Sequence, residues 1–154
     1  MLVLIFILLA YGCLNIYNVY SHPLIAAVRA GQRDAAVALL DKGAKIDDKD
    51  AHGLTALMYA AQAGHREMVE MLLNKGAHAN EKDGAGQTAL MLAADRVAKN
   101  ISPQEKEYLN IVWLLLDRGA AVDEKDNAGQ TALMRASQAG QTDVVKVLLV
   151  KGAK

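Results

Sequence analysis

A repeat of about 33 residues is the feature that most constrains how this chain can fold, because such a period is typical of solenoids built from stacked units. The hexapeptide GQTALM occurs at 86–91 and again at 129–134, and GLTALM occurs at 53–58. Glycines in a Lys/Arg-Gly-Ala context recur at Gly43, Gly76, Gly119 and Gly152. The first and last of these intervals are equal, and the middle one is longer by ten. Both series therefore indicate one repeated unit with ten extra residues in its third copy.

Each unit reads as two short helices joined by a turn. In the second copy, Thr55 is a favourable N-cap residue directly before the apolar run 56–61, and Gly64 ends that run. Apolar residues then recur within 67–73 at the three-and-four spacing of a helix with one buried face. The polar run 80–86 is too short for more than a turn or a hairpin. The pattern therefore predicts a finger, a helix, a turn and a second helix.

The second copy also resembles a known family. Residues 50–80 read DAHGLTALMYAAQAGHREMVEMLLNKGAHAN, and most fixed positions agree with the ankyrin repeat pattern DxxGxTPLHxAAxxGHxEIVxxLLxxGAxxN. Ala and Met replace the Pro and His of that pattern in three copies, which removes a polar network and keeps the helix. The resemblance covers about residues 22–154 and implies an all-α ankyrin-repeat solenoid with short β-hairpin fingers. Its four repeats would span about 22–50, 51–83, 84–126 and 127–154.

Stacking of such units predicts where the core lies, because one unit cannot bury its own apolar face. One buried ladder is expected at Leu24, Leu57, Leu90 and Leu133. A second is expected at Leu40, Leu73, Leu116 and Leu149. In the last repeat, Arg135 and Ser137 replace apolar residues, which predicts an outward-facing cap, although Val150 stands where earlier copies carry Asp or Asn.

The ten extra residues fall between the two helices of the third copy, at about 96–105. Ser102, Pro103 and Glu105 form an N-cap signature, so the second helix should begin about two turns early. Two interpretations stay open for this protruding segment. It is either an insertion tolerated in a surface loop or a contact specific to a partner.

The N-terminal segment 1–28 contains no Asp, Glu, Lys or Arg. Residues 1–20 are expected to be a hydrophobic signal peptide or membrane anchor, since about 20 apolar residues form a helix just long enough to span a bilayer. Small residues precede Cys13 in a weak match to a bacterial lipoprotein box, in which this single cysteine would be acylated. The alternative is a buried apolar extension of a cytoplasmic protein. We favour a membrane-anchored, periplasmic or otherwise exported bacterial protein.

Composition and motifs argue against several functions. Lys plus Arg and Asp plus Glu both number 17, so no overall positive charge favours nucleic acid. The four histidines lie at different repeat positions without metal-ligand spacing, and no phosphate loop or serine elbow occurs. We therefore expect no catalytic residue, no metal, no cofactor and no small-molecule substrate.

What remains is recognition of another protein. In the ankyrin family, the resemblance assigns contacts to the finger tips and to the exposed side of each first helix. Carried over by position, the expected contacts are Lys49, His52, Leu54, Tyr59, Gln62, Lys82, Gln87, Leu92, Arg96, Lys125, Gln130 and Gln138. The lysines at 49, 82 and 125 are each flanked by acids, which favours a self-neutralised edge over an anion-binding stripe.

The sequence thus predicts a non-enzymatic module that binds a partner protein on its concave face, with the membrane reached through the N-terminal segment. The alternative is an accessory factor that stabilises or protects a periplasmic or membrane enzyme.

Overall fold

The computed structural model describes residues 22–95 and 103–154, which form four helix pairs. The first helices of the pairs are α2 (Pro23–Arg29), α4 (Ala56–Ala63), α6 (Ala89–Ala94) and α8 (Ala132–Gln138). The second helices are α3 (Arg33–Asp41), α5 (Arg66–Asn74), α7 (Pro103–Asp117) and α9 (Thr142–Val150). The expected order of a first helix, a turn and a second helix is present in each pair.

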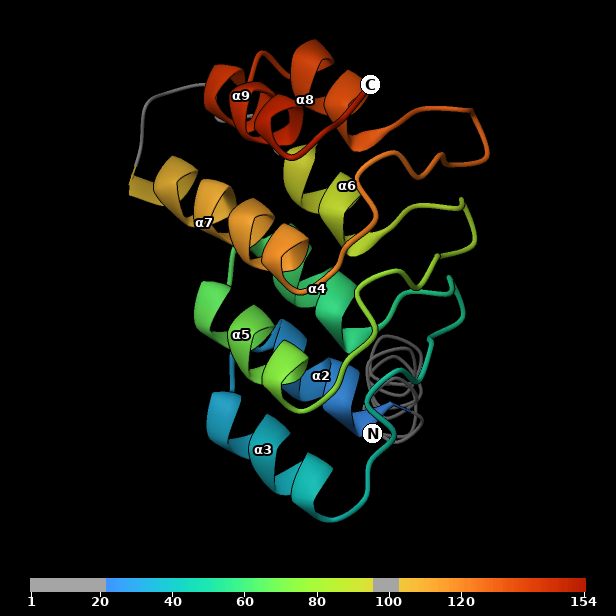
Figure 1. Cartoon of the computed structure of the whole chain (residues 1–154). Coiled ribbons are helices and arrows are strands. Elements are labelled where there is room, and N and C mark those ends of the chain that lie inside the picture. The colour runs from blue at the N-terminus through green and yellow to red at the C-terminus, as the bar shows by residue number, and fades with distance from the viewer. Residues whose placement is uncertain (1–21, 96–102) are drawn as a thin grey trace, which may run out of the picture.

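The pairs stack into two layers (Figure 1). In one layer α2, α4, α6 and α8 pack side by side, and in the other α7 packs between α5 and α9. The connections between pairs project from one side of the stack as three loops. These loops are called fingers here, with tips at 49–54, 82–87 and 125–130. The array is therefore elongated, with one edge made of fingers and the opposite edge made of the turns within pairs.

The predicted threonine N-caps are confirmed. The side-chain oxygen of Thr55 accepts the backbone N–H of Met58 at 3.3 Å, and Thr88 and Thr131 do the same for the third residue after them. All three threonines are buried, so the side chain replaces a hydrogen bond that water cannot supply. This bond fixes where α4, α6 and α8 begin.

The first predicted leucine ladder is confirmed. Leu24, Leu57 and Leu90 are buried, and Leu133 is partly buried against the same core. Alanines pack around them, which lets neighbouring first helices approach closely. This ladder forms the centre of the layer that carries the fingers.

The second predicted ladder is wrong at its end. Leu73 is buried and Leu40 and Leu116 are partly buried, but Leu149 is 54% exposed. The fully buried leucines lie one residue earlier, at Leu72, Leu115 and Leu148. In the described part of the chain, α5 is covered by α7 of the next pair, whereas the main contacts of α9 are with α7 and α8. Leu149 therefore lacks the cover that Leu73 receives.

Helix α7 begins at Pro103, as predicted, and is 15 residues long where α5 is 9. The residues that connect α6 to α7 lie outside the described part of the chain. The additional turns of α7 extend the turn edge of the array, away from the fingers (Figure 1).

The fingers are turns and not β-hairpins, since no strand occurs in residues 22–95 and 103–154. The expected hydrophobic segment 1–20, with Cys13, lies outside the described residues. Among the helices that are described, none combines the length and the apolar character needed to cross a membrane.

Candidate interaction surface

Each finger is closed by one aspartate. Asp50 Oδ1 accepts the backbone N–H groups of His52 at 2.9 Å and of Leu54 at 3.0 Å. Asp83 and Asp126 accept the equivalent pair of N–H groups, two and four residues further along, at 2.8–2.9 Å. An aspartate side chain that accepts backbone N–H groups of its own turn commonly fixes the conformation of a tight loop. The three finger tips therefore share one conformation.

Neighbouring fingers are also bonded to each other. The backbone N–H of Gly84 donates to His52 O at 2.9 Å, and that of Asn127 donates to Ala85 O at 3.0 Å. The contact is close enough that a Cβ on Gly53 would lie 2.8 Å from the backbone N of Gly84. The fingers therefore form one continuous edge and not three independent loops.

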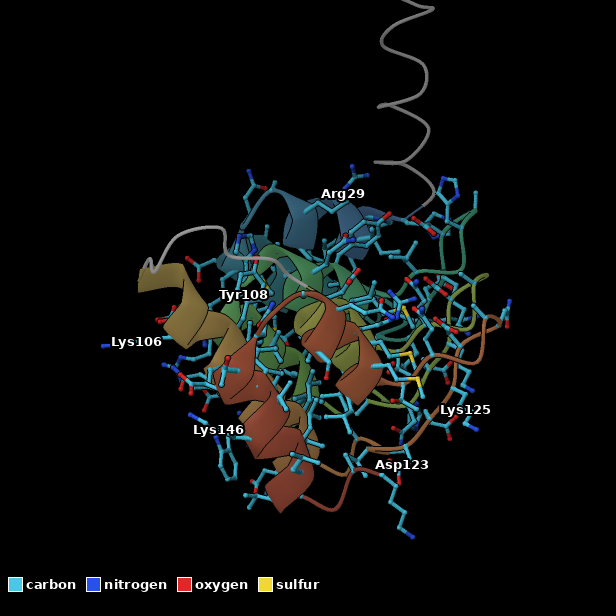
Figure 2. The ribbon with its side chains drawn as sticks, turned by 90° about the horizontal axis from the view of Figure 1, so that it is seen from above. Arg29, Lys106, Tyr108, Asp123, Lys125 and Lys146 are labelled. Carbon is cyan, nitrogen blue, oxygen red and sulfur yellow. The ribbon has the colours of Figure 1, made fainter. Side chains whose placement is uncertain are left out.

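The lysine ladder on this edge is neutralised between fingers. Lys49 Nζ lies 2.7 Å from Glu81 Oε2 and donates to Lys82 O at 2.9 Å. Lys82 repeats both contacts one finger along, with Glu124 at 2.7 Å and Lys125 O at 3.1 Å. The interpretation as a self-neutralised edge is confirmed for Lys49 and Lys82. Lys125, on the last finger, is exposed at the finger side of the array (Figure 2).

Tyr59 connects a first helix to a finger. Its hydroxyl donates to Asp50 Oδ2 at 2.6 Å, and the Arg29 guanidinium lies 5.0 Å from the centre of its ring. Burial and the neighbouring carboxylate raise the pKa of Tyr59 to about 12. Burial acts to raise the pKa of Asp50, but hydrogen bonds from Tyr59 and two backbone N–H groups outweigh it and lower that pKa. The phenol is thus held neutral and the carboxylate ionised.

Arg135 makes the equivalent connection in the last pair. Its guanidinium lies 2.5 Å from Asp126 Oδ2 and 3.3 Å from Asp95 Oδ2. The hydrogen bond from Arg135, with backbone N–H groups of the finger, lowers the pKa of Asp126. The Arg135 side chain is only 11% exposed, so the expectation that it forms an outward-facing cap is wrong. Ser137 is exposed, and its hydroxyl donates to Leu133 O at 2.8 Å.

These contacts place the expected partner-binding residues on one face. Asp95 and Gln62 hold equivalent places in their repeats, and Arg135 connects Asp95 to the finger aspartate Asp126. The fingers and the ends of the first helices therefore lie on the same surface. Its half-buried members are Leu54, Tyr59, Gln62, Gln87 and Gln130, and its exposed members are Lys49, His52, Lys82, Lys125 and Gln138.

Leu92 does not belong to this surface, contrary to the sequence-based expectation. It is 6% exposed and lies within the hydrophobic core. The equivalent residues Tyr59 and Arg135 carry polar ends that reach a finger aspartate, whereas a leucine at this place has no polar end and is buried. Arg96 lies outside the described residues.

Two features of this surface were missed from the sequence, the position of Arg29 and the structural role of Asp50. A signal was present, because Asp50 and Asp126 each precede a hydrogen-bond donor, Tyr59 or Arg135, by nine residues. Asp83 precedes Leu92 by the same interval, and there the carboxylate has no such donor.

The opposite edge of the array carries a separate contact made by the long helix α7. The Tyr108 hydroxyl donates to Gln62 O at 3.3 Å, and Glu107 Oε2 lies 3.5 Å from Arg66 Nε. Figure 2 shows Lys106, on the same helix, at the side opposite Lys125. The extension of α7 therefore braces the turn of the preceding pair.

No group of three His, Cys, Asp or Glu side chains within 22–95 and 103–154 is placed to hold a metal ion. A family model described as ankyrin repeats (3 copies) matches residues 3–83, 24–102 and 79–154. No curated protein matches the chain in a sequence search.

Proposed function

The chain belongs to the ankyrin repeat family, and from this we propose that it binds one partner protein on its finger face. We define the finger face as Leu54, Gln87 and Gln130 on the fingers and Gln62 and Gln138 on the first helices. Ankyrin repeats indicate a protein–protein interaction module, and such modules are generally not enzymes. The choice of face within the array is our own proposal.

The observation that carries this proposal is the hydrogen bonding between fingers. Gly84 N–H to His52 O and Asn127 N–H to Ala85 O join three turns into one edge. A preorganised surface loses little conformational entropy when a partner binds, which favours affinity. The half-buried side chains of the finger face then offer contact area without a large ordering cost.

Capture from membranes tests the proposal. The full chain would carry a photo-crosslinker or affinity tag, and its captured partners would be compared with those of the triple variant Leu54→Ala, Gln87→Ala, Gln130→Ala. We expect the triple variant to lose the main partner. A matched triple on other surfaces is Leu149→Ala, Gln32→Ala, Asn110→Ala, since all three side chains are exposed. Equal recovery by the finger-face variant and the wild type would overturn the proposal.

We further propose that residues 1–20 attach the module to a membrane or direct its export. The support is the absence of Asp, Glu, Lys and Arg from positions 1–28, together with a length of about 30 Å for a helix of about 20 residues. Cell fractionation with intact-mass analysis of the product tests this. Retained Met1 in the membrane fraction supports an anchor, and a start at Cys13 supports export, with added acyl mass indicating a lipoprotein. Retained Met1 in the soluble fraction would contradict both.

A further inference from the structure

We infer that the partner presents to the finger face an extended, uncharged segment of chain, which crosses the array at about three residues per helix pair. The inference rests on the proposed function and specifies the kind of partner. Three properties of the face carry it, namely its paired charges, its free side-chain amides and its spacing.

Three cationic side chains around the finger face, those of Lys49, Lys82 and Arg135, already have partners within the array, whereas Lys125 on the last finger is exposed. Lys49 and Lys82 each pair with a glutamate of the next finger at 2.7 Å. Arg135 pairs with Asp126, and that carboxylate is 2% exposed. Removing a partner from such a buried pair leaves an uncompensated charge, which is strongly unfavourable. A highly charged partner would therefore compete with pairs that the array already satisfies.

The side-chain amides of the finger face, unlike these charged groups, have no hydrogen-bond partner among the described residues. In the described part of the chain, no hydrogen bond joins the side-chain amide of Gln62, Gln87, Gln130 or Gln138 to another residue, and the first three are half-buried. A glutamine amide both donates and accepts hydrogen bonds. Its natural complement is a group that offers both, as a peptide backbone does. A helix has already satisfied most of its backbone groups internally, whereas an extended segment has not.

The spacing of the face suits an extended segment. Helices α4, α6 and α8 pack side by side, and helices in contact lie about 8–10 Å apart. An extended chain advances about 3.1–3.4 Å per residue, so about three residues span one pair. Leu54, Gln87 and Gln130 hold the same place in successive repeats. The segment would thus place an apolar residue opposite Leu54 and polar, uncharged residues three and six positions away.

A displayed library of random peptides about 12 residues long tests the inference against the full chain, purified in a mild nonionic detergent because residues 1–20 are apolar. We expect enrichment of uncharged sequences with a three-residue period. The Kd of the most enriched synthetic peptide should change less than about twofold between about 50 and about 500 mM salt, because screening acts on charges. Gln62→Ala, Gln87→Ala and Gln130→Ala should each weaken it by about threefold to tenfold, the effect of one hydrogen bond.

Gln32→Ala is the matched control. It makes the same chemical change at an exposed residue on the turn edge, away from the finger face. Equal circular dichroism and thermal midpoints would show that each variant is folded. The inference is overturned if no peptide is enriched, if the enriched peptides carry net charge and bind less well in high salt, or if the glutamine variants leave Kd unchanged.

A second arm separates this inference from the proposed function. Overlapping synthetic peptides would cover the sequence of the partner captured from membranes. If capture depends on the finger face but no peptide binds there, the partner docks as a folded domain, and only the inference fails. If capture does not depend on the finger face, the proposed function itself fails.

Discussion

The Tyr59 hydroxyl lies 2.6 Å from Asp50 Oδ2 and so joins the first helix of its pair to the finger that precedes it. Arg135 makes the same connection to Asp126 in the last pair. The third repeat has Leu92 at this place and no such connection. The finger edge is therefore held to the first helices at two of its three turns, and between them it is held by bonds from finger to finger.

Tyr59→Phe removes the hydroxyl and leaves the ring in place beside Arg29. We expect the free energy of unfolding to fall by about 1–2 kcal/mol, as for loss of a hydrogen bond to a charged acceptor on a partly buried group. Urea denaturation measures the change. Tyr108→Phe is a suitable comparison, because its hydroxyl bond to Gln62 O is longer, at 3.3 Å, and has a neutral acceptor. An effect of Tyr59→Phe no larger than that of Tyr108→Phe would contradict the role given to Asp50.

Arg135→Leu gives the last pair the residue that the third repeat has naturally. Asp126 would then keep a buried carboxylate without the counter-ion that it now has. We expect a lower urea midpoint than in the wild type at neutral pH, and this difference should narrow as the pH falls towards the range where Asp126 protonates. The comparison is Leu92→Ala, which removes core volume but no charge, so its difference from the wild type should not narrow in this way. A midpoint that is unchanged by Arg135→Leu would show that the pair contributes nothing to stability.

The lowered pKa values of Asp50 and Asp126 predict a loss of stability in acid. Their pKa is lower in the folded than in the unfolded chain, so the unfolded state binds more protons and stability rises with pH. The contribution is complete above the unfolded value of about 3.9 and disappears as the pH falls through the folded values. Urea unfolding at pH values from about 2 to 6 would show it. Tyr59→Phe should flatten this dependence, and an equally steep curve in that variant would contradict the assignment.

The local features of this fold were predictable, and the features that depend on relative helix position were not. Thr55 as an N-cap and Leu57 in the first ladder follow from spacing within one repeat. Leu73 is buried and Leu149 is exposed because a further helix covers only Leu73. The periodicity of the sequence does not show which helix covers which residue. In the candidate site, the family pattern placed the fingers correctly but assigned Leu92 to the surface.

The spacing of charges in the sequence predicted that the finger lysines are neutralised, but not which acid pairs with which lysine. The acids beside each lysine in the sequence suggested neutralisation, and this is what occurs. However, Lys49 pairs with Glu81, which belongs to the next finger, and not with its sequence neighbours Asp48 or Asp50. Such a pair depends on how two repeats are stacked, which only the three-dimensional structure defines.

Gly64→Ala tests whether the extended helix α7 braces the second pair. Gly64 has a φ of +74°, and a Cβ there would lie 3.0 Å from Tyr108 Cζ. The matched control is Gly140→Ala, in the equivalent turn of the last pair, where φ is +71° and no atom lies within 4 Å of the added Cβ. Both variants should lose about 1–2 kcal/mol because of the left-handed backbone, and Gly64→Ala should lose more because Tyr108 must move. Tyr108→Ala should remove that excess in the double variant. If the two glycine variants are equally destabilised, α7 does not press on this turn, and its contacts with the second pair do not brace it.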